Sequence, residues 1–308
     1  MDSPRFVRIE CNVPLKWRPL IHITEGLGFL DSAEDLSVSI VVPTKNSMRT
    51  IRQCLKATRD QSYPCFIVVV DNFSTDETAS IAREYADRVI AAGPERSAQR
   101  NIGAGAFLTD VVGFIDSDMV LSRSVVEEVV QNIRVGHVAV VVPEWTSGNG
   151  YWARVRAYER SLYAGAAQNE AARFFATEAF EQAGGFDLNL TGPEDWDLDI
   201  RVRLIGTVGR TNADIEHMEG DVTFLGACRK KGYYGLGLAR FAKKHGSQSI
   251  NLAIDRPYFR KPSLLINRWG PGLVLLKLGE GTAVIVSALR ASIRGNPRLK
   301  MGNGHSGS

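Results

Sequence analysis

The sequence predicts an α/β domain with a mainly parallel central sheet, because buried-type strands alternate with amphipathic helices along its first half. Residues 37–43 (SVSIVVP) and 65–71 (CFIVVVD) are apolar and rich in β-branched residues, as strands covered on both faces are. A helical pattern follows the first strand, with Met48, Ile51 and Leu55 on one face. Strands that alternate with helices form right-handed crossovers and lie parallel.

The alternation continues beyond these elements. Ser74 or Thr75 is expected to cap a second helix, with Glu77 in capping-box spacing after Ser74. Further strands are expected at 88–92, 111–116 and 137–143, and helices at about 97–107 and 123–134. After residue 145 the pattern changes to a helix over about 151–172, a strand near RFFAT at 173–177, and a Gly-rich turn.

Charge is unevenly distributed along the 308 residues. Residues 228–300 hold fifteen Lys and Arg against two acids, a net charge of +13, which leaves −10 for the rest of a chain whose total is +3. A basic segment of this kind suits an anionic partner, either a membrane surface or a nucleic acid, although a solvated basic surface is the plainer alternative. Because Gly, Leu and Val rather than stacking aromatics separate its charges, we expect no nucleic acid.

The C-terminal segment is apolar but interrupted by charge. Its longest charge-free run is shorter than the roughly 18 residues of a membrane-crossing helix, so we expect amphipathic helices in the interface of an anionic leaflet. The alternative is a helical subdomain packed on the α/β body. The first twenty residues do not resemble a signal peptide, and the cysteines lack CxxC spacing; both favour a location in the reducing cytoplasm. Together with the basic segment, this predicts a peripheral protein on the cytoplasmic face of a membrane.

Carboxylates follow one of the predicted strands. Asp116 and Asp118, separated by one residue, come directly after an apolar strand, where Pro43 and Asp71 also fall if the strands are parallel. Two carboxylates at a strand end can share a divalent cation, which would also neutralise a diphosphate. Alone this spacing is more typical of a solvated loop, but its position after a buried strand favours a binding site.

A second acidic cluster, GPEDWDLDIRV at 192–202, begins a predicted helix. Asp195 at its N-terminal end is a candidate general base for an acceptor hydroxyl. Acids that complement the helix dipole are the alternative, and this explains Glu194 and Asp197 well.

Six segments in order resemble the family-two glycosyltransferases: VSIVVPTKN, VVVDNFSTDET, RSAQRNIGA, FIDSDM, FEQAGGFD and GPEDWDLDIRV. They span about residues 37–220. The resemblance implies the GT-A nucleotide-sugar-binding fold in residues 37–227, after an extension (1–36) and before the basic amphipathic segment (228–300) and a disordered tail (301–308).

The resemblance also implies roles for single residues. The nucleotide-sugar would be held by Pro43, Thr44, Asp71, Asp76, Arg100 and Asp116. For Asp76, a role as a helix cap is an equal alternative. Arg100 would approach the base or the phosphates, and Arg96 is a weaker candidate for the same role. The alternative for both is an ordinary surface arginine. Asp118 would bind Mn²⁺ or Mg²⁺, with His217 as a further ligand.

The implied reaction is an inverting transfer to a lipid-linked or glycan acceptor. Asp195 would deprotonate the acceptor hydroxyl, while the metal stabilises charge on the departing nucleoside diphosphate. Two other classes remain open. A nucleotidyltransferase would show a Gly-rich loop with an arginine after the first strand, where this chain reads PTKNSMRT; the other is a catalytically inactive, membrane-associated nucleotide-sugar-binding protein.

Overall fold

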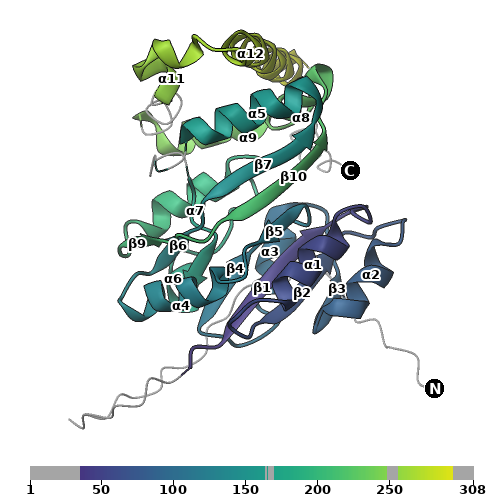
Figure 1. Cartoon of the computed structure of the whole chain (residues 1–308), viewed down its shortest axis with the longest axis vertical. Coiled ribbons are helices and arrows are strands. Elements are labelled where there is room, and N and C mark those ends of the chain that lie inside the picture. The colour runs from purple at the N-terminus through teal and green to yellow at the C-terminus, as the bar shows by residue number, and fades with distance from the viewer. Residues whose placement is uncertain (1–34, 164, 166–169, 248–255, 294–308) are drawn as a thin grey trace, which may run out of the picture.

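The computed structural model describes residues 35–163, 165, 170–247 and 256–293. The expected disordered tail and all but the last two residues of the expected N-terminal extension lie outside these ranges. Figure 1 shows an α/β body at one end of the molecule and a layer of helices at the other, joined by two long strands.

A seven-stranded sheet forms the centre of the body, in the order β3-β2-β1-β4-β8-β6-β9. All its pairs are parallel except those of β8, which runs antiparallel to β4 and β6, so the expected mainly parallel sheet is confirmed. Its strands are β1 (Val38–Thr44), β2 (Phe66–Asp71), β3 (Arg88–Ala91), β4 (Val111–Phe114), β6 (Ala139–Val141), β8 (Phe174–Ala176) and β9 (Val208–Arg210).

The alternation of side chains along each strand places a hydrophobic cluster on both faces of this sheet. Ile40 and Val42 of β1 belong to one cluster, and Val41 between them belongs to the other. The body helices that flank the sheet are α1 (Ile51–Arg59), α2 (Thr78–Tyr85), α3 (Arg96–Ala104), α4 (Val125–Arg134), α6 (Thr177–Gln182) and α7 (Glu194–Val202). Burial on both faces explains the continuous apolar character of the strand sequences.

Two helix boundaries differ from the expected ones. The helix expected to start at Ser74 or Thr75 begins at Thr78, because the Ser74 hydroxyl donates to Asp71 (2.5 Å) instead of capping the helix. The N-cap residue is Glu77, and the Asp76 carboxylate just before it accepts from the Thr78 backbone N–H at 3.0 Å. Helix α5 spans Gly150–Tyr163, and residues 170–172, which the expected helix would include, are not helical.

A second sheet connects the body to the helical layer. It has the order β5-β10-β7, with β10 antiparallel to β5 and parallel to β7. The strands are β5 (Met119–Leu121), β7 (Glu144–Asn149) and β10 (Ile215–Asp221). Strand β7 leads directly into α5 and β10 is followed closely by α8, so both strands extend from the site region to the helical layer (Figure 1).

The helical layer contains α5 and the C-terminal helices. Its core includes Val155, Ala227, Leu273 and Leu276. The expected boundary at residues 227/228 falls within α8. Within the described ranges, Gly270–Ser287 is the one stretch long and apolar enough, by length and composition, for a membrane-crossing helix. The C-terminal elements are α8 (Phe224–Tyr233), α9 (Gly235–His245), α11 (Pro257–Arg260), the 3-10 turn η1 (Pro262–Leu265) and α12 (Gly270–Ile293).

Candidate active site

The ends of three neighbouring parallel strands meet at one edge of the main sheet. Thr44 pairs in register with Asp71, and Asp116 lies two residues after the end of β4, which pairs with β1. Pro43 and Thr44 are buried at the end of β1. The Gln99 side chain of α3 donates to the Thr44 carbonyl at 3.1 Å and so fixes this edge. The topology therefore brings together the residues expected at the strand ends.

Asp71 and Asp76 are both engaged in local hydrogen bonds. The Asp71 carboxylate accepts from the Ser74 backbone N–H at 3.0 Å and from the Ser74 hydroxyl. Asp76 accepts from the hydroxyl of Thr78 (2.5 Å), and this bond is the main cause of its lowered pKa. Asp76 thus has the contacts of a helix cap, and its role toward a nucleotide stays a prediction.

Arg100 is fully buried and connects two acids of the site. Its Nη1 donates to Asp195 Oδ1 at 2.7 Å and its Nη2 to Asp116 Oδ1 at 2.8 Å, while its guanidinium lies 5.0 Å from the centre of the Phe186 ring. Burial would raise the pKa of Asp116, but Arg100 and Arg173 outweigh it and hold this pKa far below its ordinary value. Arg100 is therefore not a surface arginine, and it keeps Asp116 ionised.

Arg96 lies one helical turn before Arg100 and is more than one-third exposed. Its Nη2 is 3.0 Å from Glu194 Oε1, and its guanidinium is 5.6 Å from the Tyr234 ring centre. Glu194 is buried at the start of α7, and burial together with the neighbouring Asp195 raises its pKa. Arg96 and Arg100 thus hold the N-terminal end of α7 against α3.

Asp118 and His217 face each other from adjoining chain segments. His217 Nε2 lies 3.3 Å from Asp118 Oδ2, because β10 pairs with β5 directly after Asp118. On the other side of the ring, Arg160 Nη1 lies 3.0 Å from His217 Nδ1, and Glu144 Oε2 lies 3.7 Å from it. Burial lowers the pKa of His217, but hydrogen bonds with Asp118 and Glu144 outweigh it and raise this pKa.

The donor atoms suit a cation whose remaining ligands come from a diphosphate and water. In the described part of the chain, no three His, Cys, Asp or Glu side chains form a complete metal cluster. Asp118 and His217 do supply one carboxylate and one imidazole at a single place. Hard divalent cations next to phosphates are commonly held by only one or two protein ligands. The residues present therefore fit Mn²⁺ or Mg²⁺ bound together with a nucleotide.

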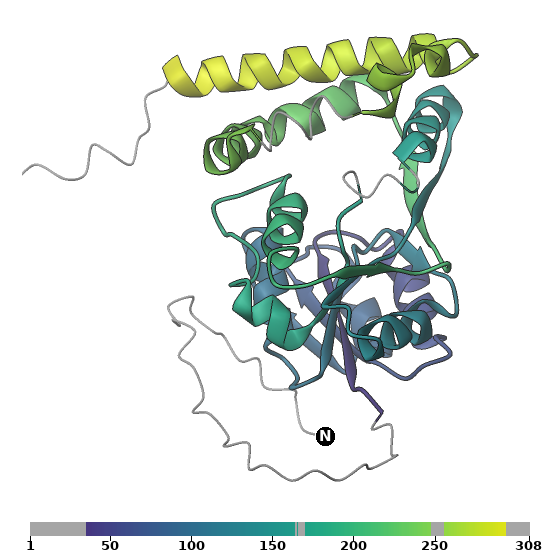
Figure 2. The same cartoon turned by 90° about the vertical axis from the view of Figure 1, so that its left-hand side faces the viewer.

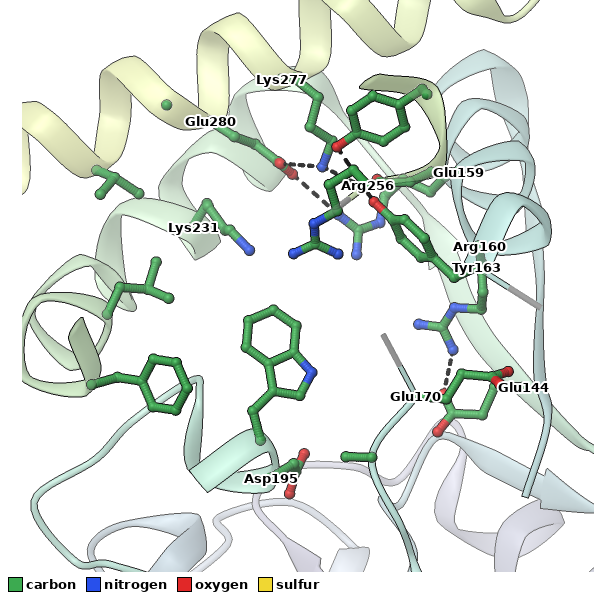
Figure 3. A pocket seen from close by; sticks show the side chains of 18 of the residues that line it. Glu144, Glu159, Arg160, Tyr163, Glu170, Asp195, Lys231, Arg256, Lys277 and Glu280 are labelled. Atoms are coloured by element: carbon green, nitrogen blue, oxygen red, sulfur yellow. Dashed lines mark hydrogen bonds and ion pairs between the residues drawn. The ribbon is translucent and has the colours of Figure 1, made fainter. Parts of the chain in front are cut away.

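A cavity of about 860 Å³ lies between α7 and the helical layer. Asp195 and Trp196 line it from α7, and Figure 3 shows charged side chains of α5, α8 and α12 that point into it from the other side. Lys231 is one of these, and it has no hydrogen-bond or ion-pair partner among the residues described. Burial lowers the pKa of Lys231. The side chains of these three helices that Figure 3 labels are Glu159, Arg160, Tyr163, Lys231, Lys277 and Glu280.

Sequence reasoning missed the polar side of this cavity. A signal was present, because Arg156, Glu159, Arg160 and Tyr163 recur at helical spacing and mark a polar face of α5. Their partners could not be read from α5 alone. Arg156 pairs with Glu219 of β10 and with Glu280 of α12, which lie 63 and 124 residues away.

Residues 39–187 match the sequence profile of glycosyl transferase family 2. A pre-mycofactocin glycosyltransferase of Mycobacterium tuberculosis is 25% identical over 280 residues, which are 84% of this chain and 56% of that protein. The chain thus spans about half the length of this curated relative.

Two solved structures share the fold. The mannosyltransferase PcManGT of Pyrobaculum calidifontis, in complex with GDP-Man and Mn²⁺, superimposes with a TM-score of 0.51 at 17% identity over 86% of this chain and 78% of that one. S. aureus TarS 1–349 in complex with UDP has a TM-score of 0.51 at 16% identity, over 85% and 93% of the two chains. Together with the strand order, these likenesses confirm the expected α/β fold.

Proposed function

We propose that this chain, whose residues 39–187 match the sequence profile of glycosyl transferase family 2, transfers a sugar from a nucleoside diphosphate sugar to an acceptor hydroxyl. The observation that supports this best is the shared guanidinium of Arg100, which holds Asp116 on the strand-end side and Asp195 on the cavity side. A donor at the strand ends and an acceptor in the cavity would meet between these two carboxylates.

On the donor side, we propose that Thr44 and Asp71 contact the nucleoside and that Asp116 contacts the ribose or phosphates. Asp118 and His217 would hold the divalent cation, which supplies Lewis-acid stabilisation to the leaving diphosphate when bound. Asp116 pairs with Arg100, whereas Asp118 and His217 lie 3.3 Å apart and would bind the metal of a metal–diphosphate complex at this edge of the sheet. The complexes of PcManGT with GDP-Man and of TarS with UDP support a nucleotide-sugar donor.

On the acceptor side, Asp195 is the proposed general base. Arg100 Nη1 donates a hydrogen bond to Asp195 Oδ1 at 2.7 Å and so orients the carboxylate. Asp195 keeps part of its surface open and lines the cavity, which supports a role for its other oxygen in accepting the proton of an acceptor hydroxyl. A base on the acceptor side and a leaving diphosphate on the opposite side correspond to a single in-line displacement with inversion.

The acceptor is proposed to be lipid-linked or a glycan precursor, and to lie in the cavity beside Trp196. Lys231 is an ammonium group without a partner in the described structure, and it faces the same space (Figure 3). It suits an acceptor that carries a negative charge. We further propose that the chain works as a peripheral protein on the cytoplasmic face of an anionic membrane, which the charge of +13 in residues 228–300 supports.

The decisive experiment is a panel of UDP-, GDP- and dTDP-sugars incubated with the purified chain, with and without Mn²⁺ or Mg²⁺. We expect thermal stabilisation by one nucleotide class in the presence of metal, and release of the nucleoside diphosphate. Release of pyrophosphate would identify a nucleotidyltransferase instead. Stabilisation without turnover in the presence of any acceptor extract would identify an inactive binding protein.

A further inference from the structure

Helix α12 has its charged side chains on the face that packs on the protein. Lys277 Nζ lies 2.7 Å from Glu159 Oε1 of α5 and 2.6 Å from Glu280 Oε2. Glu280 is almost completely buried and pairs with Arg156 Nη1 at 3.3 Å. From Gly270 to Leu289, these are the only two charges of the helix. Both are therefore neutralised on the inner side.

The opposite face of α12 is apolar and exposed. Its large side chains retain between 42% and 65% of their accessible surface. At 1.5 Å per residue, positions 274 to 289 extend over about 22 Å. Helices on protein surfaces usually point their apolar stripe inward and their charges outward, and α12 has the reverse arrangement. The residues of this outer stripe are Val274, Leu275, Leu278, Ile285 and Leu289.

We infer that the outer stripe of α12 docks on a lipid bilayer, with the helix parallel to the membrane plane. This rests on the proposed membrane localisation and identifies the surface that makes the contact. Figure 2 shows α12 as the outermost element along one end of the molecule, so a plane can contact it over its whole length without touching the α/β body. An exposed apolar stripe of this length is an interaction surface rather than ordinary protein surface.

Charge favours a bilayer over another protein as the occupant. The chain immediately before α12 exposes Lys261 and Arg268 next to the exposed apolar side chains Phe259 and Ile266. Cations beside an apolar face match the anionic headgroups and acyl chains of one leaflet. The outer stripe itself carries no charge that would select a protein partner.

The packing of α12 also distinguishes lying on the membrane from crossing it. Its inner face contributes Leu273 and Leu276 to the core of the helical layer, and it packs along α8 and α9. To cross the bilayer, the helix would leave these contacts and carry Lys277 and Glu280 into hydrocarbon, where charged side chains are strongly disfavoured. In the docked orientation both charges stay in their ion pairs, and the cavity beside Asp195 lies behind the membrane-facing helix.

The test compares two double variants of the full chain in vesicle sedimentation. L278Q/I285Q replaces two side chains of the outer stripe, and the matched control L108Q/L204Q replaces two leucines of the α/β body that are each 83% exposed. We expect the first to lower the partition coefficient onto vesicles containing anionic lipid at least tenfold, and the control to bind like the wild type. Because all four side chains are exposed, thermal unfolding should be unchanged in both variants.

A second measurement reports how deeply the helix lies. L278W should show emission that is quenched by brominated lipid more strongly than the wild-type emission. Wild-type binding by L278Q/I285Q, or an L278W emission insensitive to brominated lipid, would overturn the inference. The wild type could instead form a dimer in lipid-free solution that L278Q/I285Q dissociates and the control variant does not. If L278Q/I285Q then bound vesicles like the wild type, the stripe would be assigned to contact with a second copy of the chain. Donor binding in solution is measured separately, so failure of the glycosyltransferase proposal would not be mistaken for failure here.

Discussion

Arg100 donates to Asp195 at 2.7 Å and to Asp116 at 2.8 Å from a position without solvent exposure. The two acids lie on different elements, one at the start of α7 and the other after β4. A planar guanidinium with several donors in fixed geometry can hold both at once, which a lysine cannot do in the same way. The proposed base and the proposed donor carboxylate are therefore positioned by a single residue of α3.

The first prediction follows from this contact. R100K retains the positive charge but loses the planar guanidinium that donates to both carboxylates at once. Asp195 is then no longer held in place, so turnover should fall about 100-fold. R96K is the matched control, because Arg96 is on the same helix and contacts Glu194 but not Asp195 within hydrogen-bond distance. Steady-state kinetics and thermal unfolding measure the two effects. Equal losses in both variants would argue against a special role for Arg100.

The second prediction separates catalysis from binding. D195N retains the size of the side chain and its oxygen acceptor for Arg100, but removes the base. Turnover should fall by roughly 10²–10⁴-fold, while the nucleoside diphosphate binds with metal as it does to the wild type. Binding is measured by calorimetry and turnover by nucleotide release. Near-wild-type turnover at saturating acceptor would remove Asp195 from the mechanism and make Glu194 the next residue to test.

The strand pattern predicted much of this site. Asp71 and Asp116 follow buried strands, and parallel pairing alone places such residues at one edge. The position of Asp195 at the start of a predicted helix also indicated a role for it. These predictions required only local patterns and the order of the strands, whereas Asp118 and His217 as metal ligands came from the resemblance to the family-two glycosyltransferases.

The buried network could not be predicted in the same way. Arg100 looks like an ordinary helical arginine until α3 and α7 are packed together, because its partners lie 16 and 95 residues away. The inverted polarity of α12 depends likewise on Glu159 and Arg156 of a distant helix. Composition shows that Lys277 and Glu280 interrupt an apolar run, but only packing shows which way they point.

The third prediction concerns the metal. D118N should weaken metal-dependent nucleotide binding at least tenfold, because it removes the charged oxygen that faces His217. Nucleotide binding measured without metal should change little. If exhaustive chelation left wild-type activity undiminished, the metal role of Asp118 and His217 would be excluded.

The fourth prediction concerns the attachment of α9 to the body. Asp197 is fully buried and accepts from His245 Nε2 at 2.7 Å and from Arg201 Nη2 at 2.6 Å. Burial would raise the pKa of Asp197, but hydrogen bonds from Lys244, His245 and Arg201 outweigh it and lower this pKa. D197N should therefore destabilise the fold at pH 7 by roughly 3–5 kcal/mol, the usual result of breaking a buried ion pair.

The sign of its pH dependence follows from the lowered pKa. The stabilisation by Asp197 is fully present above its unfolded pKa of about 3.9 and is lost as the pH falls through its lower folded pKa. Urea unfolding of wild type and D197N should thus differ most near pH 7 and converge below about pH 4. A difference that stays constant down to pH 3 would contradict an ionic origin.

The last prediction concerns Lys231, which faces the cavity without a hydrogen-bond or ion-pair partner in the described part of the chain. K231M keeps much of the apolar stem but removes the charge, so the KM for a negatively charged acceptor should rise about tenfold while the KM for the donor stays unchanged. K230M is the matched control, because Lys230 precedes it on α8 and is exposed. Burial lowers the pKa of Lys231, so its positive charge is present at lower pH and is lost as the pH rises, before the ordinary lysine range is reached. Acceptor affinity should therefore fall with rising pH in the wild type, and this dependence should vanish in K231M. Identical acceptor KM values in K231M and K230M would show that the acceptor does not contact this ammonium group.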